Sequence, residues 1–337
     1  MDPVNYKRLT TTRGFTYAYY LGKPSDEALA ELDPNDPPLP ALLFLHGFPT
    51  SSRLWKHQVA FFVQRGFVVI VPDLLGFGES SKPTEVESYR CSLVCQDIVE
   101  IIDTERLQDV IAIGHDLLRS KIVSRLGNFY PDRFKAYGFL VVPYCAPRPK
   151  SKIEFTSMIT KKMCGFELCG HMVFYAEDGS DKLIESQLDS FFSVLFPCDP
   201  MVRTTHVAPM GALRSWLEHG KTTKMASYIS PEDLDYWRTV ITRDGIAAAL
   251  CWHKGLVTGV NADDDKLIPL ERYPVPKPVF FAAAIKDYIS PAILGIATTN
   301  HHCRNATVRQ FNEGHWLMLA SSTEINTALL SWVMDCI

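Results

Sequence analysis

Short runs of consecutive apolar residues recur along the chain, and each run ends at turn or polar residues. Because these runs are continuous rather than alternating, each is typical of a strand that is buried on both faces of a parallel sheet. Segments with helical apolar spacing separate the runs. Strand and helix in alternation predict an α/β fold with a doubly wound, mostly parallel sheet. The strands are expected within residues 40–48, 66–74, 109–116, 136–144 and 278–287, and the helices between them within 52–66, 91–107 and 121–134.

One long stretch, from residue 147 to residue 255, lacks the strand pattern. Its apolar residues follow helical spacing instead, and turn residues separate the helical segments. A helical cap inserted into the sheet domain is therefore predicted. The chain is divided into a first part of the core (1–146), the cap (147–255) and a second part of the core (256–337). The helices of the cap are expected within residues 181–196, 211–220 and 230–254.

The composition is that of a globular protein and narrows the range of partners. The 337 residues include 34 Lys and Arg against 38 Asp and Glu, which gives a net charge of −4, and no long basic run is present. Nucleic acid and anionic membranes are therefore not expected partners. No apolar run reaches the roughly 18–20 residues of a membrane span, and the first 15 residues lack the apolar centre of a signal peptide. We expect a cytoplasmic protein, as a monomer or a homodimer, whose partner is a small-molecule substrate.

The nine cysteines show neither a CxxC motif nor the Cys and His spacing of a metal site. Most of them lie in apolar or helical contexts. In a chain without a secretory signal, reduced thiols are expected rather than disulfides. No metal and no cofactor are predicted.

Three polar residues form a candidate catalytic set. Asp116 ends "GHD" (114–116), where a sharp turn after a buried strand would expose its carboxylate as a nucleophile. The ester formed by that attack must be hydrolysed. His315 in "NEGHW" (312–316) is suited to act as the base, because the pKa of an imidazole is near neutral. Asp287, after the last clear strand, can hold the imidazole in the required tautomer.

Two backbone N–H groups are expected to form an oxyanion hole for the hydrolysis of that ester. One belongs to Phe48 in "HGFP" (46–49), and the other to Leu117, which follows Asp116. Each motif alone is weak evidence. The chain order of nucleophile, acid and histidine on an α/β pattern is much more specific.

From about residue 10 to its end the chain resembles the epoxide hydrolases of the α/β-hydrolase fold, particularly fungal ones. "HGFPTSSRLW" is similar to the oxyanion-hole segment of that family, "VPDLLGFGESSKP" to the turn that follows it, and "AAIKDYISP" and "NEGHW" to its acid and histidine segments. The resemblance implies that Asp116 is the nucleophile, that Asp287 and His315 assist it, and that the helical insertion roofs the active site. Dehalogenases share the aspartate and most of this layout, so the motifs specify the mechanism class better than the substrate.

The turn at Asp116 departs from the family pattern. Family members usually continue with Trp, Gly and a small residue, whereas this chain continues with Leu117, Leu118 and Arg119. The missing glycine normally lets the helix pass close to the strand. A distorted turn with one extra residue is therefore predicted. Arg119 either binds a substrate carboxylate or faces solvent.

The cap also departs from the family pattern. Epoxide hydrolases of this family hold the epoxide oxygen with two cap tyrosines, and the resemblance places His253 and His171 at their positions. Tyr175 and Tyr236 lie near enough in the sequence to substitute for them. Histidine can act as acid or base near neutral pH, whereas tyrosine is a hydrogen-bond donor and a weak acid. Trp316, after the predicted base, is expected in the pocket wall or the core.

Together these features predict an epoxide hydrolase-like enzyme that acts on an apolar small molecule, with a fungal secondary metabolite as the expected substrate class. A second hypothesis keeps the fold but not the hydrolysis: the altered turn and cap would catalyse isomerisation or cyclisation by acid–base chemistry, without net addition of water. A third hypothesis is a non-catalytic protein that binds a small molecule in the same pocket. The complete set of Asp116, Asp287 and His315 argues against the third.

Overall fold

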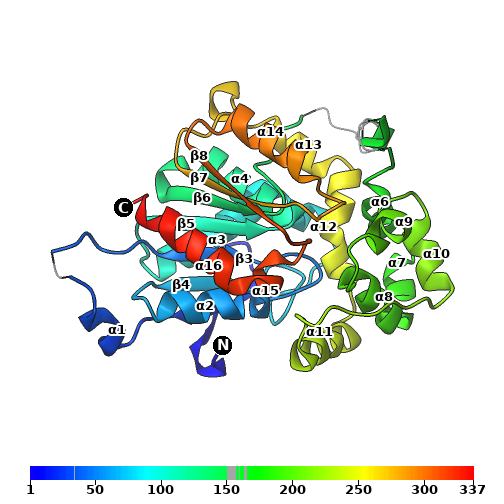
Figure 1. The fold of residues 1–337 in the computed structure, drawn as a ribbon, viewed down its shortest axis with the longest axis horizontal. Coiled ribbons are helices and arrows are strands. Elements are labelled where there is room, and N and C mark those ends of the chain that lie inside the picture. The colour runs from blue at the N-terminus through cyan, green and yellow to red at the C-terminus, as the bar shows by residue number, and fades with distance from the viewer. Residues whose placement is uncertain (34, 150–156, 159, 163–164) are drawn as a thin grey trace.

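An eight-stranded sheet forms the centre of the molecule (Figure 1). The computed structural model describes residues 1–33, 35–149, 157–158, 160–162 and 165–337. The strand order is β1-β2-β4-β3-β5-β6-β7-β8, and only the β1–β2 and β2–β4 pairs are antiparallel. The strands are β1 (Tyr6–Thr10), β2 (Thr16–Gly22), β3 (Leu42–Leu45), β4 (Val69–Pro72), β5 (Val110–His115), β6 (Phe134–Leu140), β7 (Val279–Ala284) and β8 (Ala306–Phe311).

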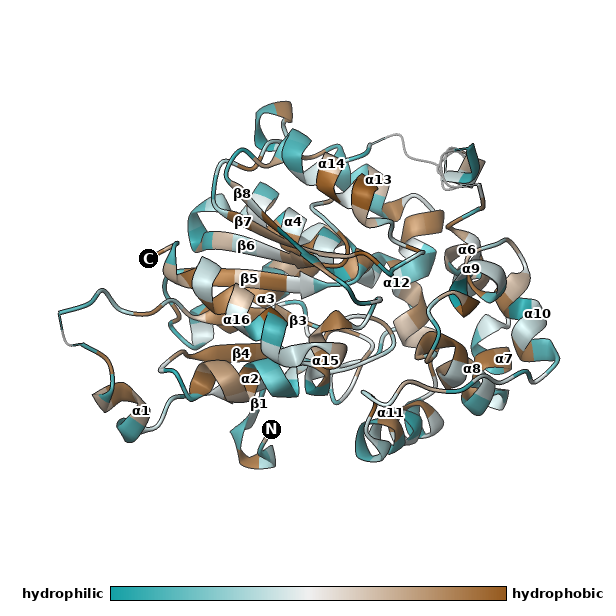
Figure 2. Cartoon of the chain, in the orientation of Figure 1, coloured by the Kyte–Doolittle hydropathy of each residue, from teal (hydrophilic) through white to brown (hydrophobic). Residues whose placement is uncertain are grey.

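The central strands are buried on both faces, as their continuous apolar sequences predict. Every residue of β3, β4, β5 and β7 is buried, and the apolar colouring of Figure 2 runs along β4, β5 and β7. The outermost strands β1 and β8 are mostly exposed or half-buried. The five strands predicted from the sequence are therefore confirmed. The sequence pattern missed β1, β2 and β8.

Helices cover both faces of the sheet. Phe280 of β7 packs against Trp332 on one face, with ring centroids 5.4 Å apart. The neighbouring Phe281 points to the other face, where it contacts Gly295 so closely that a Cβ there would lie 2.6 Å from its ring. On the first face lie α2 (Lys56–Val63), α15 (Leu317–Ala320) and α16 (Ser322–Met334), and on the other α3 (Cys91–Thr104), α4 (Leu117–Phe129) and α14 (Ala292–His302).

A group of helices between β6 and β7 lies to one side of the sheet (Figure 1). We call α6 to α12 the cap helices. Trp252 and Trp316 join them to the core: the indole N–H of Trp252 donates to the carbonyl of Leu75, and that of Trp316 to the carbonyl of Leu195, both at 2.8 Å. The helices are α6 (Gly170–Ala176), α7 (Ser180–Ser186), α8 (Leu188–Leu195), α9 (Val202–His206), α10 (Ala212–Glu218), α11 (Pro231–Asp244) and α12 (Ala247–Val257), followed by α13 (Val260–Asp265).

Several predicted helices have different bounds in the structure. The helix expected within 121–134 begins four residues earlier, at Leu117. The segment 181–196 forms two helices that are separated at Gln187, and the segment 230–254 is interrupted at Gly245, whose φ is 74°. Helical periodicity does not reveal an interruption of one or two residues, because the apolar spacing continues on both sides of it. One further short helix, α1, spans Asp26–Ala30.

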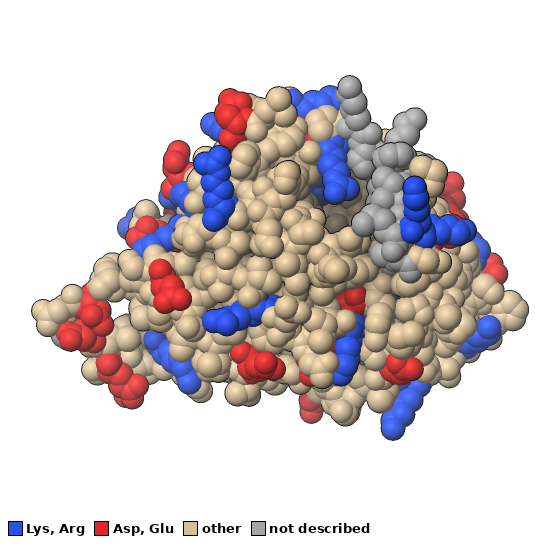
Figure 3. All heavy atoms as spheres, turned by 45° about the horizontal axis from the view of Figure 1, so that its top comes forward, with Lys and Arg blue, Asp and Glu red and all other residues tan. Residues whose placement is uncertain are grey.

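Among the described residues, no helix is long and apolar enough to cross a membrane. Within the same ranges, no three His, Cys, Asp or Glu residues are grouped so that they could hold a metal ion. Figure 3 shows acidic and basic side chains interspersed over one face of the molecule, without a continuous basic patch.

Candidate active site

A single residue, Asp116, separates β5 from α4. Its φ of 74° and ψ of 163° lie in a region that side-chain-bearing residues rarely adopt, and such strain is concentrated at functional sites. Gly114 allows α4 to pass close to the strand, because a Cβ there would lie 2.9 Å from the carbonyl oxygen of Arg119. Leu118 is buried in the hydrophobic core. Leu118 packs inward, and the helix begins directly after Asp116. The extra residue relative to the family's turn stays a prediction.

The carboxylate of Asp116 receives two backbone hydrogen bonds. The N–H of Leu117 donates to Oδ1 at 2.7 Å, and the N–H of Phe48 donates to Oδ2 at 3.3 Å. These are the two groups that the sequence predicted as an oxyanion hole. The Phe48 loop is held by His46, whose Nε2 accepts from the N–H of Leu74 at 3.0 Å and whose Nδ1 lies 2.9 Å from the carbonyl oxygen of Gly47. Both donors are thus directed at one carboxylate before any ligand binds.

His315 and Asp287 form the pair that the sequence predicted. Nδ1 of His315 lies 2.7 Å from Oδ2 of Asp287, and Nε2 of His315 lies 3.8 Å from Oδ1 of Asp116. The other oxygen of Asp287 accepts the backbone N–H groups of Ile289 at 3.0 Å and Ser290 at 3.3 Å. An ionised Asp287 favours the tautomer with the proton on Nδ1, which leaves Nε2 free to accept a proton beside Asp116.

The surrounding charges keep both carboxylates ionised. Burial alone would raise the pKa of Asp116, but His315, His115, Arg119 and the N–H of Leu117 bring it below its usual value. Burial would likewise raise the pKa of Asp287, and the charge and hydrogen bond of His315 together with the charge of Arg203 hold it well below its usual range. An ionised Asp116 is the form that can act as a nucleophile.

Two cap histidines and a tyrosine lie together over Phe48. The ring of His253, on α12, lies 4.7 Å from those of Phe48 and Tyr175, and Tyr175 lies 4.9 Å from Phe48. His171, one turn before Tyr175 on α6, has its ring centroid 5.9 Å from that of Tyr175. The structure therefore brings His171, Tyr175 and His253 into one wall that faces the oxyanion-hole loop.

These cap groups are neutral at neutral pH. Burial lowers the pKa of His171 and that of His253 to about 3, although the Asp116 carboxylate acts in the opposite direction. Burial also raises the pKa of Tyr175 well above its usual value. Nδ1 of each histidine and the hydroxyl of Tyr175 are buried without a hydrogen-bond partner among the described residues. Neither histidine is therefore expected to carry a charge near neutral pH, and their roles as acid or base stay predictions.

Arg119 does not face solvent. It is fully buried between the rings of Phe77 and Trp252, 4.7 and 4.6 Å from their centroids. Burial lowers the pKa of its guanidinium to about 10, although the Asp116 charge opposes the shift. No guanidinium nitrogen has a hydrogen-bond partner among the described residues. The solvent-facing alternative is therefore wrong, and Arg119 acts on Asp116 through its charge.

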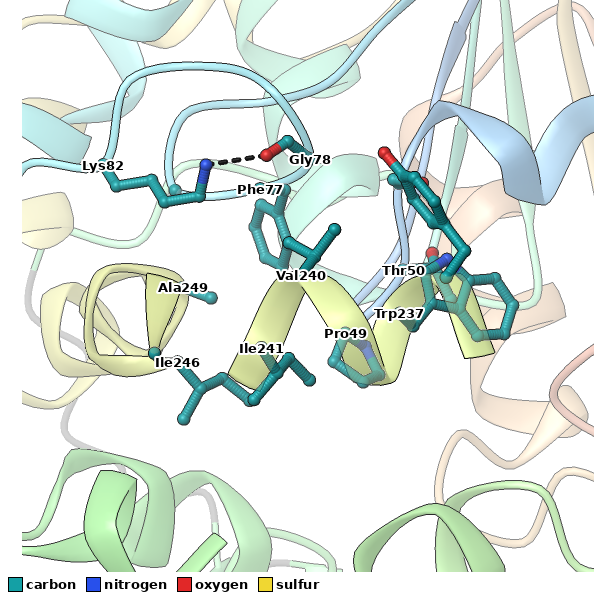
Figure 4. A pocket seen from close by; sticks show the side chains of 14 residues that line it. Pro49, Thr50, Phe77, Gly78, Lys82, Trp237, Val240, Ile241, Ile246 and Ala249 are labelled. Atoms are coloured by element: carbon teal, nitrogen blue, oxygen red, sulfur yellow. Dashed lines mark hydrogen bonds between the residues drawn. The ribbon is translucent and has the colours of Figure 1, made fainter. Parts of the chain in front are cut away.

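Tyr236 lies apart from the other cap residues. It stacks on the guanidinium of Arg53 at 4.9 Å and lines a small hollow of about 20 Å³ between α11 and the loops of the core. The rings of Pro49 and Trp237 and the side chain of Ile241 lie in the same wall (Figure 4). The structure does not bring Tyr236 together with His171 and His253.

Trp316 belongs to the wall behind the candidate base. Its ring lies 5.1 Å from that of His315 and 4.5 Å from that of Phe196 in the cap. His115 packs beside it and contacts the carbonyl oxygen of His315 through Nε2 at 2.9 Å. Both residues therefore pack against His315 and hold it in position.

Arg203, on α9, is a site residue that the sequence did not reveal. Its Nη1 lies 4.0 Å from Oδ1 of Asp287, and its side chain is about one tenth exposed. It lines a polar hollow of about 140 Å³ together with Asp287, His315 and Tyr228. No motif marks an arginine that reaches the site from a distant cap helix, so only the three-dimensional structure could identify it.

A larger cavity of about 290 Å³ lies between the core and the cap. Leu117 follows Asp116, Met172 follows His171, and Ile289 lies two residues after Asp287, and all three line this cavity. Its size is at the lower end of the roughly 300–1,000 Å³ that is usual for small-molecule sites. Neighbours in sequence of the candidate catalytic residues therefore line this cavity, whereas Asp116, Asp287 and His315 themselves do not.

Comparison with known proteins shows which proteins this chain resembles. Residues 40–142 match the family model described as alpha/beta hydrolase fold. The chain is 25% identical over 304 residues to the bifunctional epoxide hydrolase 2 of Sus scrofa, which covers 87% of this chain and 51% of that one. The chain thus spans about half the length of this relative.

Two further matches cover nearly the whole of both chains. An epoxide hydrolase of Neurospora crassa is 23% identical over 325 residues, which cover 92% of this chain and 90% of that one. The solved structure of epoxide hydrolase A from Mycobacterium thermoresistibile matches 97% of each chain with a TM-score of 0.75 and 22% identity. These findings confirm the predicted α/β-hydrolase fold and the predicted resemblance to epoxide hydrolase enzymes, a fungal one included.

Proposed function

We propose that the protein is an epoxide hydrolase-type enzyme in which Asp116 opens the epoxide of an apolar small molecule. The observation that carries this proposal is the geometry around Asp116. An ionised carboxylate, two converging N–H donors and the paired His315 and Asp287 supply what covalent catalysis by a carboxylate requires.

In the first step an oxygen of Asp116 attacks an epoxide carbon, the carbon–oxygen bond of the ring breaks, and an ester and an alkoxide form. The cap supplies donors for that alkoxide. Neutral His171 and His253 each carry one ring N–H, and Tyr175 carries a buried hydroxyl without a partner among the described residues. Such donors stabilise charge that develops in a site from which water is excluded.

In the second step water attacks the carbonyl carbon of the ester. His315 accepts the proton of the water through Nε2, and Asp287 stabilises the imidazolium that results. The N–H groups of Phe48 and Leu117 stabilise the negative oxygen of the tetrahedral intermediate. Collapse of this intermediate breaks its bond to the substrate oxygen, which takes the proton from the His315 imidazolium. The second proton of the water neutralises the alkoxide of the first step, so a diol is released and the Asp116 carboxylate is regenerated.

The test is to trap the ester. In His315→Gln, ring opening should proceed while hydrolysis of the ester stops, so intact-protein mass spectrometry should show one substrate equivalent bound through Asp116. His219→Gln is the matched control, because His219 is exposed on the cap. Turnover of His315→Gln at the wild-type rate would show that His315 is not the base.

A second candidate function is isomerisation or cyclisation without net addition of water. The cap histidines favour it, since the ring N–H of a neutral imidazole can donate a hydrogen bond to a substrate oxygen without water taking part. The two backbone N–H groups that donate to the Asp116 carboxylate favour hydrolysis instead. The product mass separates the two, because hydrolysis adds one water and isomerisation adds none.

We infer an apolar secondary metabolite as the substrate class. The mostly apolar lining of the cavity and the similarity to a fungal relative support this inference. A cytoplasmic location and a homodimeric state are proposals of the same kind, to be tested by cell fractionation and by light scattering. A purely binding protein would have no use for the pair formed by His315 and Asp287.

A further inference from the structure

The 290 Å³ cavity has one face formed by α4. Leu117, Lys121 and Arg125 all line it, and their spacing of four residues places them along one side of the helix. Eight residues separate Leu117 from Arg125, which corresponds to about 12 Å along the helix axis. Leu117 adjoins the nucleophile, so this row of side chains leads from Asp116 to a second end of the cavity.

That second end is basic. Lys121, Arg125 and Arg148 line it, and Asp265 is the one acidic residue among the described residues of the lining. Asp265 accepts from Nε of Arg125 at 2.7 Å and from the backbone N–H of Arg148 at 2.8 Å, and it lies 3.6 Å from Nζ of Lys121. Two cationic side chains, those of Lys121 and Arg125, therefore share one carboxylate, and the exposed Arg148 adds a third positive charge to the lining.

The rest of the lining is largely apolar. Its side chains come from both the core and the cap, and include Val142, Ala146, Leu168, Met172, Leu256 and Ile289. A charged end on an otherwise apolar cavity suits a ligand that has an apolar body and one ionised group.

Arg125 supplies a second, independent observation. Its side chain is 1% exposed, and it donates through Nε to Asp265 and through Nη1 to Asn128 at 3.1 Å and to the carbonyl of Cys145 at 2.7 Å. Its Nη2 is buried and has no hydrogen-bond partner among the described residues. A buried guanidinium N–H without an acceptor is costly, and a carboxylate oxygen from a ligand would satisfy it.

We propose that the substrate carries a carboxylate that binds to Lys121 and Arg125, about 12 Å along α4 from the residue next to the nucleophile. This inference rests on the proposed function for the reaction at Asp116, while the binding of the carboxylate can be measured without turnover. Lys121 supplies a charge that the 3.6 Å contact with Asp265 only partly neutralises, and Arg125 supplies the free N–H. Arg148 adds positive charge at the rim.

The test compares decanoate with decan-1-ol by isothermal titration calorimetry at neutral pH. The two probes share an alkyl chain and differ in the charged group. Decanoate should bind wild-type protein at least tenfold more tightly than the alcohol. Lys121→Met should remove most of that preference, and Arg148→Met part of it. Lys266→Met is the matched control, because Lys266 is exposed, pairs with Asp263 and does not line the cavity.

Arg125→Met removes three structural hydrogen bonds as well as the free N–H, so the Lys121 and Arg148 variants carry the test. Equal affinity for the two probes, no binding of either, or an undiminished preference in Lys121→Met would overturn the proposal. The absence of an ester at Asp116 in His315→Gln would instead contradict the proposed function, and it would leave the calorimetric result intact.

Discussion

The two walls of the active site differ in how their polar groups are satisfied. On the core wall, both oxygens of Asp116 accept a backbone N–H, and Asp287 is bonded to His315 and to two further N–H groups. On the cap wall, Nδ1 of His171, Nδ1 of His253 and the hydroxyl of Tyr175 are buried without partners among the described residues. Aromatic packing, rather than hydrogen bonding, holds the cap wall.

This difference indicates that the two walls have different roles. The core groups are fixed in position before a ligand binds, which is what a nucleophile and its base require. A buried polar atom without a partner costs about 1–3 kcal/mol, and a ligand that supplies the missing acceptor or donor recovers that cost. Under the proposed function, the core wall carries the chemistry at Asp116, and the cap wall selects the oxygen that is held against it.

The largest expected effect comes from the core wall. Asp287→Asn should lower turnover by roughly 10⁴-fold, because the amide favours the wrong tautomer of His315. The slowed step should be hydrolysis of the ester, so the Asp116 adduct should accumulate. Stopped-flow kinetics and intact-protein mass spectrometry measure this accumulation. Asp335→Asn, at an exposed position, serves as the control. If no adduct accumulates although turnover is lost, Asp287 has no part in the second step.

A smaller effect of a different kind is expected from the cap wall. His253→Phe should slow ring opening by roughly 10²-fold, which is typical when a hydrogen-bond donor to a developing negative oxygen is lost. Adduct should then form slowly and should not accumulate. His253→Tyr restores a donor and should recover hydrolysis of simple epoxides. Wild-type behaviour of both variants would mean that His253 contributes only to packing.

Arg119 lies behind the core wall and should have a more modest effect on pH dependence. Its charge lowers the pKa of Asp116, so Arg119→Met should raise that pKa and move the acid limb of the kcat/KM profile to higher pH. Arg119→Lys keeps the charge and should leave the limb near its wild-type position. Circular dichroism checks that both variants fold. If Arg119→Met and the wild type have the same pH profile of kcat/KM, the charge of Arg119 does not control the pKa of Asp116.

The smallest expected effect concerns stability in acid. His253 has a pKa of about 3 in the folded protein and an ordinary value of 6.5 when unfolded. Below pH 6.5 the unfolded chain therefore binds a proton that the folded protein does not, and stability falls as the pH falls toward 3. His253→Phe should reduce the slope of unfolding free energy between pH 6 and pH 4 by up to about 1.4 kcal/mol per pH unit. Urea titrations at several pH values measure the slope of the unfolding free energy against pH. An unchanged slope in His253→Phe would contradict the burial of a neutral His253.

Most of the core could be predicted from the sequence, because strands buried on both faces leave unbroken apolar runs. The edge strand β1 escaped prediction because its residues are half-buried or exposed and carry no such run. Asp116, Asp287 and His315 were predictable because each occupies a motif at a strand end or in the last loop. Arg203, Lys121 and Arg125 were not, since their positions beside the candidate site and the cavity depend on the way the cap lies over the core.

The most direct test of the account is a single turnover in ¹⁸O-water, with excess wild-type enzyme and a long-chain terminal epoxide. Mass spectrometry of the peptide that contains Asp116 and of the product then follows the oxygen. The account predicts ¹⁸O in the Asp116 carboxylate, a product heavier than the substrate by one water, and loss of both in Asp116→Ala. An isomeric product of unchanged mass, with no label in Asp116, would contradict it.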